Sequence, residues 1–95
     1  MIDKLPEAEK WDLIGFDKIS PHRRQTLKAL EKDYLMPSEI ARLTGIRTTQ
    51  ASSALIDLKS KELVVCMNES AHKGRIYMIT ELGLDLLHMI EKKQP

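Results

Sequence analysis

A short run of hydroxyl, amide and guanidinium side chains offers the clearest hydrogen-bonding chemistry in this sequence. The run comprises Arg47, Thr48, Thr49, Gln50, Ser52 and Ser53. An ordinary surface helix usually carries long charged side chains, whereas short polar groups suit close approach to phosphates and base edges. Thr49, Gln50 and Ser53 are the expected base readers, and the Gln50 amide suits adenine through paired hydrogen bonds. The run therefore predicts a surface that binds nucleic acid.

Two helices joined by a tight turn, within residues 37–61, are expected to position this run. Ile40 gives the first helix an apolar side, and Gly45 supplies a residue that tolerates positive φ at the corner. The second helix buries a stripe at helical spacing that consists of Ala51, Ala54, Leu55 and Leu58. Such a second helix can place its N-terminal residues in the DNA major groove. Any two-helix corner needs a small residue and an apolar plug, so the corner alone also fits a purely structural role.

An arm is expected ahead of the main domain. Residues 1–10 show no clear period and are expected to be irregular. Residues 11–19 hold the single Trp and the single Phe, and so apolar a segment must pack on something. It can close the domain's own core or contribute to a dimer contact. The predicted organisation is an arm over residues 1–19 that packs on a domain over residues 20–95.

The domain is expected to open with a helix at Ser20 and Pro21, which provide an N-cap hydroxyl and a proline in the first turn. This helix is predicted to run to about Lys32. Its buried side would carry Leu27, Ala29, Leu30 and Tyr34, and its solvent side Arg23, Arg24 and Lys28. The basic residues fit a solvated face, with a phosphate contact as the alternative.

A β-hairpin is predicted after the two-helix corner. Residues 63–67 and 75–79 are rich in apolar and β-branched side chains, and a polar, turn-forming loop joins them. A hairpin in this place would form a wing, at about residues 68–75, beside the second helix of the corner. The residues of the wing expected to contact the DNA backbone or the minor groove are His72, Lys73 and Arg75.

The last helix is expected to begin at Thr80 and Glu81 and to end near Lys92. Its apolar positions cover more than half of its circumference, which is wider than a single core stripe. This width favours a second copy of the chain as a partner, with a dimer interface at Leu84, Leu87 and Ile90. The alternative is a helix packed deeply into its own domain.

Composition fits one globular domain. The chain has 95 residues, of which 42% are hydrophobic and 31% charged, and no apolar run is long enough to span a bilayer. The net charge of +1 is weak support for nucleic-acid binding. The start of the chain lacks the features of a signal peptide. A single cysteine allows no internal disulfide, so a cytoplasmic location is expected.

Catalytic and metal-binding chemistry is not indicated. His22, His72 and His88 fall in three different predicted elements, and no hydrolase, zinc or phosphate-loop motif occurs. The chain is therefore expected not to be an enzyme and to need no cofactor or metal. Cys66 fits a small core residue, with a redox-responsive thiol as the alternative. The sequence identifies no effector.

Several segments together resemble small archaeal winged helix-turn-helix transcriptional regulators, and more widely the MarR-like and ArsR-like regulators. The matching motifs are Ile14-Gly15-Phe16, Ser20-Pro21-His22-Arg23, Pro37-Ser38-Glu39-Ile40-Ala41, Thr44-Gly45-Ile46, Lys73-Gly74-Arg75-Ile76-Tyr77 and Thr80-Glu81-Leu82-Gly83. The resemblance implies a mainly α fold with a small β-hairpin: a three-helix core, a wing and a C-terminal helix. The family usually has glycine where this chain has Glu62, which implies either a strained left-handed backbone there or a turn that is built differently. It also often carries a long basic residue at the places of Ser53 and Ile56.

The resulting hypothesis is a homodimeric regulator that binds specific double-stranded DNA. A recognition helix at about residues 47–60 would enter the major groove, and a dimer would place two such helices about 34 Å apart. The alternative is a winged helix used as a protein–protein interaction module in a transcription or nucleic-acid-processing complex. RNA binding is a third possibility, although no aromatic stacking platform is visible in the sequence.

Overall fold

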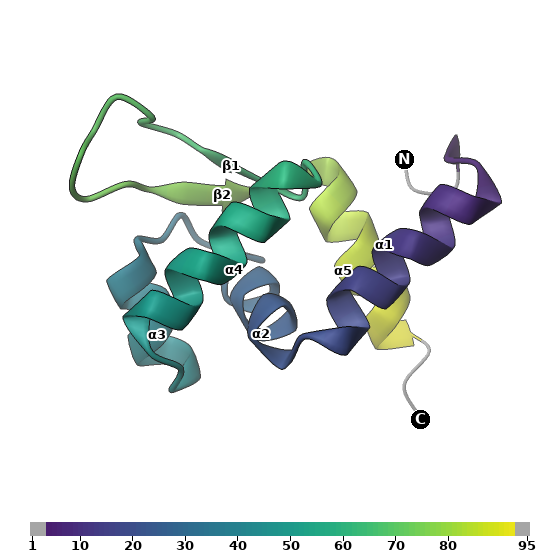
Figure 1. Cartoon of the computed structure of the whole chain (residues 1–95), viewed down its shortest axis with the longest axis horizontal. Helices are drawn as coiled ribbons and strands as arrows, with labels where there is room; N and C mark the ends of the chain where they lie inside the picture. The colour runs from purple at the N-terminus through teal and green to yellow at the C-terminus, as the bar shows by residue number, and fades with distance from the viewer. Residues whose placement is uncertain (1–3, 93–95) are drawn as a thin grey trace.

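The computed structural model describes residues 4–92, except for the side chains of residues 17–19. Five helices and one antiparallel hairpin make up this part of the chain (Figure 1). Their order is α1 (Glu7–Ile19), α2 (Pro21–Ala29), α3 (Pro37–Thr44), α4 (Thr48–Ser60), β1 (Val64–Cys66), β2 (Tyr77–Ile79) and α5 (Glu81–Lys92). This order confirms the predicted mainly α fold with a small hairpin ahead of the last helix.

Helix α1 begins at Glu7, so the expectation of an irregular segment is wrong for residues 7–10. Its first turn is acidic, and negative charge at that end is favourable to the helix dipole. Farther along, Leu13 and Ile14 are buried in one apolar cluster with residues of the other helices. These two side chains therefore help to close the chain's own core, whereas Trp11 is 55% exposed.

Helix α2 starts as predicted, because the Ser20 hydroxyl accepts a hydrogen bond of 3.3 Å from the backbone N–H of Arg23. It ends at Ala29, earlier than the predicted Lys32. The Leu30 N–H still bonds back to the helix, and the chain then turns away toward the hairpin. The predicted start of the helix is correct and its predicted end is too late.

Leu35 joins the hairpin as a third, single-residue strand. Its N–H and carbonyl exchange hydrogen bonds of 3.1 and 2.9 Å with Tyr77 of β2. Successive side chains of an extended segment point to opposite faces, so a buried Leu35 turns Tyr34 outward. The predicted burial of Tyr34 is therefore wrong, and its side chain is 63% exposed.

The two-helix corner is built as predicted. Gly45 ends α3 with φ at +81°, and its N–H donates to the Ala41 carbonyl at 2.9 Å. Ile46 follows it and packs, partly buried, against the core. The predicted stripe of α4, which consists of Ala51, Ala54, Leu55 and Leu58, is buried. The opposite side of α4 is left to face solvent.

The hairpin has shorter strands than predicted. Regular pairing covers only Val64 to Cys66 and Tyr77 to Ile79, and Val64 lies opposite Ile79. One further backbone bond, from the Met67 N–H to the Ile76 carbonyl at 2.7 Å, extends the pairing toward the loop. Beyond it, side chains rather than strand pairing hold the loop together.

Helix α5 begins at the predicted cap, where the Thr80 hydroxyl accepts from the Gly83 N–H at 3.0 Å. Gly83 packs so closely that an added Cβ would lie 2.2 Å from the Leu63 carbonyl oxygen. Leu87 and Ile90 are each 1% exposed and belong to the chain's own core. The prediction that these two residues form a dimer surface is therefore wrong, since the domain itself covers them. Leu84 is partly buried against the same core.

Candidate nucleic-acid interface

The start of α4 presents most of the predicted contact residues to solvent. Thr48, Thr49 and Ser53 are exposed, and Ser52 is half-buried beside them. Arg47 stands just before the helix and is exposed as well. In Figure 1 the start of α4 and the loop of the hairpin lie at the same end of the molecule. The structure thus brings the predicted recognition residues and the wing to one end of the fold.

Gln50 has a structural partner that the sequence interpretation did not include. Its side-chain Oε1 accepts a hydrogen bond of 2.9 Å from the backbone N–H of Arg47. This bond satisfies one of the N–H groups that lack partners at the start of a helix. Pairing with adenine needs both the oxygen and the nitrogen of the amide, so the cap competes with the predicted contact. In this conformation Gln50 offers its amide N–H groups as donors.

The basic residues of the wing differ in how they are held. His72 and Lys73 are exposed on the loop. The Arg75 guanidinium instead folds back over its own loop, where Nε donates to the Ala71 carbonyl at 2.9 Å and Nη2 to the Glu69 carbonyl at 3.0 Å. Arg75 therefore orders the loop, and its charge stays at the wing surface.

Asn68 holds the base of the wing, a role that sequence reasoning missed. Its Oδ1 accepts from the Ile76 N–H at 2.7 Å, and its Nδ2 donates to the Gly74 carbonyl at 3.1 Å. The two bonds join both ends of the loop through one side chain. An asparagine directly after a strand is a known turn signal, so its position could have suggested this role.

An ion pair joins α4 to the wing. Lys59 Nζ, near the end of α4, hydrogen-bonds the Glu69 carboxylate in the wing loop. The ammonium holds the pKa of Glu69 below its ordinary value, and the carboxylate raises the pKa of Lys59. The contact links the wing to α4, but both side chains are largely exposed and salt screens the pair, so its contribution to stability is small.

A second contact fixes α4 from the opposite side. Asp57 of α4 accepts a hydrogen bond of 3.0 Å from Arg23 Nη2. Arg23 was expected on the solvent side of its helix but is half-buried and links α2 to α4. A groove of about 250 Å³ lies beside this pair, between the start of α2 and α4. It is lined by Ser20, His22, Arg23, Thr49, Gln50, Ser53, Ala54 and Asp57.

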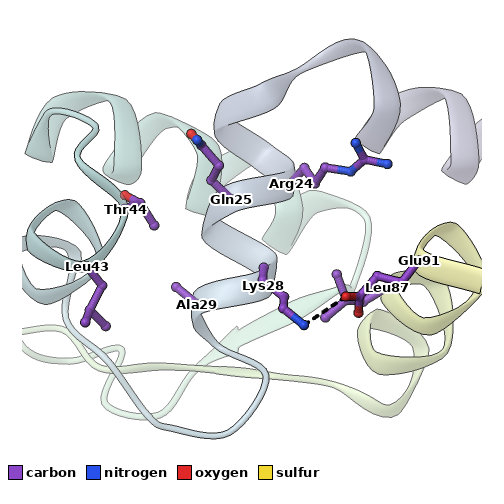
Figure 2. A pocket seen from close by; sticks show the side chains of 8 residues that line it. All are labelled: Arg24, Gln25, Lys28, Ala29, Leu43, Thr44, Leu87 and Glu91. Atoms are coloured by element: carbon purple, nitrogen blue, oxygen red, sulfur yellow. Dashed lines mark hydrogen bonds and ion pairs between the residues drawn. The ribbon is translucent and has the colours of Figure 1, made fainter. Parts of the chain in front are cut away.

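A larger groove of about 390 Å³ lies between α2, the end of α3 and α5. Figure 2 shows its apolar lining at Ala29, Leu43 and Leu87, and the Lys28–Glu91 contact at one side. Lys28 Nζ donates to Glu91 at 2.9 Å and to Glu31 at 2.8 Å. Its charge already has two carboxylate partners, so this groove does not present Lys28 as an open anion site.

Cys66 and metal ligation are the remaining chemical features that the sequence raised. Cys66 is half-buried, with Sγ 3.6 Å from Asn68 Oδ1, and its redox role stays a prediction. Among residues 4–92, no group of three or more His, Cys, Asp or Glu side chains is placed to hold a metal ion. Within the same range, no helix has the length and apolar character needed to cross a membrane.

Comparison with known proteins finds similarity in structure alone. No protein-family model matches the chain, and no curated protein matches it in sequence. A homodimeric winged helix-turn-helix DNA-binding domain from Mycobacterium bovis, described as a possible ArsR-family transcriptional regulator, superposes with a TM-score of 0.67. The sequences are 25% identical, and the match covers 90% of this chain and 78% of that one.

Two mutant forms of MepR from Staphylococcus aureus give the same result at lower identity. One has a TM-score of 0.66 at 17% identity, over 90% of this chain and 68% of that one. The other, from a multidrug-resistant clinical isolate, has a TM-score of 0.66 at 20% identity, over 92% and 64%. The chain therefore has the winged helix-turn-helix fold of ArsR-like and MarR-like regulators. The archaeal part of the sequence resemblance stays a prediction.

Proposed function

We propose that this chain is a transcriptional regulator that binds specific double-stranded DNA as a homodimer. Helix α4 enters the major groove, and the wing contacts the phosphate backbone or the minor groove. The observation that carries the proposal is the exposure of Arg47, Thr49 and Ser53 at the end of the molecule that also carries the basic wing. The similarity to a homodimeric DNA-binding domain supports the same reading.

The proposed roles follow the chemistry of each side chain. Thr49 and Ser53 hydrogen-bond base edges, and Gln50 donates from its amide nitrogen while its oxygen caps the helix. Arg47 and Lys73 bind phosphates. Thr48, Ser52 and His72 lie beside these groups and complete the contact surface, and Arg75 acts mainly by ordering the wing.

A protein–protein interaction module remains the second candidate function. The net charge of +1 favours it, because it attracts a polyanion only weakly, and two Arg75 donors already bond carbonyls of their own loop. In that case the wing and α5 provide the contact surface, and α4 contacts no nucleic acid.

Fluorescence anisotropy with a labelled duplex of mixed sequence tests DNA binding directly. A fourfold rise in salt should weaken binding about 3.5-fold for each phosphate contact made. Arg47→Ala and Lys73→Ala should each weaken binding and make it less sensitive to salt. Lys4→Ala serves as a matched control, because it removes an equal charge just before α1, which lies at the other end of the molecule in Figure 1.

Specific binding then requires a preferred sequence, which selection from a random duplex library can identify. Thr49→Ala and Ser53→Ala should change the preferred bases more than they change binding to an unrelated duplex. Absence of binding by the parent protein at about 50 mM salt would contradict the proposal. Equal loss of affinity in the Lys4 and Arg47 variants would also count against it.

A further inference from the structure

The Arg23 side chain, which belongs to α2, contacts both α1 and α4. It projects from the first turn of α2, and its Nη2 donates to the Asp57 carboxylate of α4 at 3.0 Å. Its Nη1 donates to the Phe16 carbonyl in the last turn of α1 at 3.2 Å. The guanidinium carbon also lies 4.0 Å from the centre of the Phe16 ring. One side chain therefore contacts α1 and α4 at the same time.

These contacts use properties that belong to arginine in particular. A planar guanidinium can donate in two directions while its face stacks on an aromatic ring, which an ammonium group does not do. Carbonyl groups at the end of a helix run short of intrahelical donors, and Arg23 supplies one to Phe16. Only 25% of the Arg23 side chain is exposed, so its interaction with Asp57 is screened less than a fully exposed pair would be.

Asp57 lies on the side of α4 that the proposed function turns toward DNA. It follows Ser53 by one helical turn and Thr49 by two, and all three line the groove between α2 and α4. An unpaired carboxylate in this position would repel the phosphates of an approaching duplex. The bound guanidinium cancels that charge and links the third turn of α4 to the end of α1.

We propose that Arg23 is a positioning residue for DNA recognition, which neutralises Asp57 and fixes α4 against α1 and α2. This inference rests on the proposed function, because it concerns the same DNA-binding helix. Arg23 affects DNA binding by positioning α4 and does not itself contact the nucleic acid. The orientation of α1 is then linked to the orientation of the recognition helix through one guanidinium group.

A double-mutant cycle in DNA affinity tests the proposal. The variants are Arg23→Gln, Asp57→Asn and the two combined, measured by anisotropy at fixed salt. Arg23→Gln should weaken binding about tenfold, and adding Asp57→Asn to it should recover at least about threefold. In the parent background Asp57→Asn should bring no comparable gain. Arg24→Gln, the matched control, removes an equal charge from the next residue and should weaken binding less than about threefold.

Amide hydrogen exchange separates this inference from the proposed function. Arg23→Gln should speed exchange in α4 and at the end of α1 more than Arg24→Gln does. If the parent protein binds no DNA, the proposed function fails, and the exchange result still decides whether Arg23 positions α4. An additive cycle, or equal exchange in the two arginine variants, would overturn the inference. Arg23→Lys keeps the charge but loses the planar fork, so its affinity should fall between those of the parent and Arg23→Gln.

Discussion

Glu62 occupies a backbone conformation that suits glycine better than any residue with a Cβ. Its φ of +60° makes it the one non-glycine residue with positive φ among residues 4–92. The left-handed region costs an ordinary residue about 1–2 kcal/mol, because its Cβ crowds the following carbonyl. The family resemblance left open a left-handed residue or a differently built turn, and the structure has the left-handed residue.

Replacement of Glu62 by glycine should therefore stabilise the protein. The backbone strain energy removed from the folded state exceeds the entropic cost that glycine adds through the unfolded chain. The free energy of unfolding should therefore rise by about 0.5–1 kcal/mol. Urea denaturation measures the change, with Glu62→Ala as the control that removes the carboxylate but keeps the Cβ. A glycine variant no more stable than the alanine variant would contradict the explanation.

The sequence shows which side chains are polar but not which groups they hydrogen-bond. Gln50 and Arg75 were both predicted to face DNA, yet one caps α4 and the other bonds carbonyls of its own loop. Both partners are backbone groups, which exist at every position and leave no mark in the sequence. Residue types alone therefore predicted a polar, exposed start of α4 but could not show which backbone group each side chain bonds.

Asn68 joins the two ends of the wing loop at its base. Asn68→Ala would remove two hydrogen bonds that join the ends of the loop, at 2.7 and 3.1 Å. Each bond of this kind contributes about 0.5–1.5 kcal/mol, so the local stability of the wing should fall by about 1–3 kcal/mol. Hydrogen exchange of the wing amides measures the change.

The matched control is Ser70→Ala in the same loop, which should leave exchange in the wing nearly unchanged. The core helices should keep their protection in both variants, because the hairpin loop contributes little to the apolar core. Equal exchange in the Asn68 and Ser70 variants would show that the strands, and not Asn68, hold the wing.

A clasp between α2 and α5, formed by Lys28, Glu31 and His88, makes the free energy of unfolding depend on pH. Glu31, just after α2, hydrogen-bonds Lys28 at 2.8 Å and contacts His88 of α5 at 3.0 Å. The Lys28 ammonium, and then His88, hold the pKa of Glu31 below its ordinary value. The folded state thus binds a proton at Glu31 less readily than the unfolded state, so the stabilisation is present near neutral pH and is lost on acidification.

Thermal unfolding of Glu31→Gln at two pH values tests the clasp. At about pH 7 the variant should unfold at a lower temperature than the parent, and at about pH 3 the difference should be smaller, because acidification protonates the carboxylate. Asp33→Asn is the control, because it removes a nearby carboxylate outside the clasp. A difference that persists unchanged at low pH would exclude the ionised carboxylate as its source.

Among the elements, those with strong local signals were predicted well. The corner at Gly45 and the caps at Ser20 and Thr80 combine a characteristic residue with clear periodicity, and all three lie where expected. The start of α1 was missed because its first residues are polar and have no apolar stripe. The strands end early because tertiary contacts of the loop, and not β propensity, decide where pairing stops.

For the whole molecule, the sequence correctly indicated an unusually apolar last helix but not what covers it. Leu87 and Ile90 pack inside one chain, so any homodimer must use other residues. Trp11 on α1 is a candidate, since it is 55% exposed and tryptophan is enriched at the centres of interfaces. Helix α1 packs beside α5. A dimer contact at Trp11 would therefore lie on the same side of the molecule as the contact that the sequence predicted on α5.

Analytical ultracentrifugation tests a dimer contact at Trp11. The parent should sediment at about twice the 10.9 kDa mass of one chain, and Trp11→Ala should weaken dimerisation at least about tenfold. Tyr34→Ala is the control, because it removes an aromatic side chain that is similarly exposed, at 63%, in the turn before Leu35. A monomeric parent, or dissociation caused by the Tyr34 variant alone, would rule out Trp11 as the contact.

The tight packing of Gly83 has a consequence for how this protein tolerates sequence change. Alanine is the better helix former, yet here its methyl group would collide with the Leu63 main chain and with Ile79 Cγ1 at 2.7 Å. A library randomised at position 83 and sorted for folded protein should therefore return almost only glycine. At Gly15, where an added methyl group meets nothing within 4 Å, the same sorting should accept alanine and many other residues.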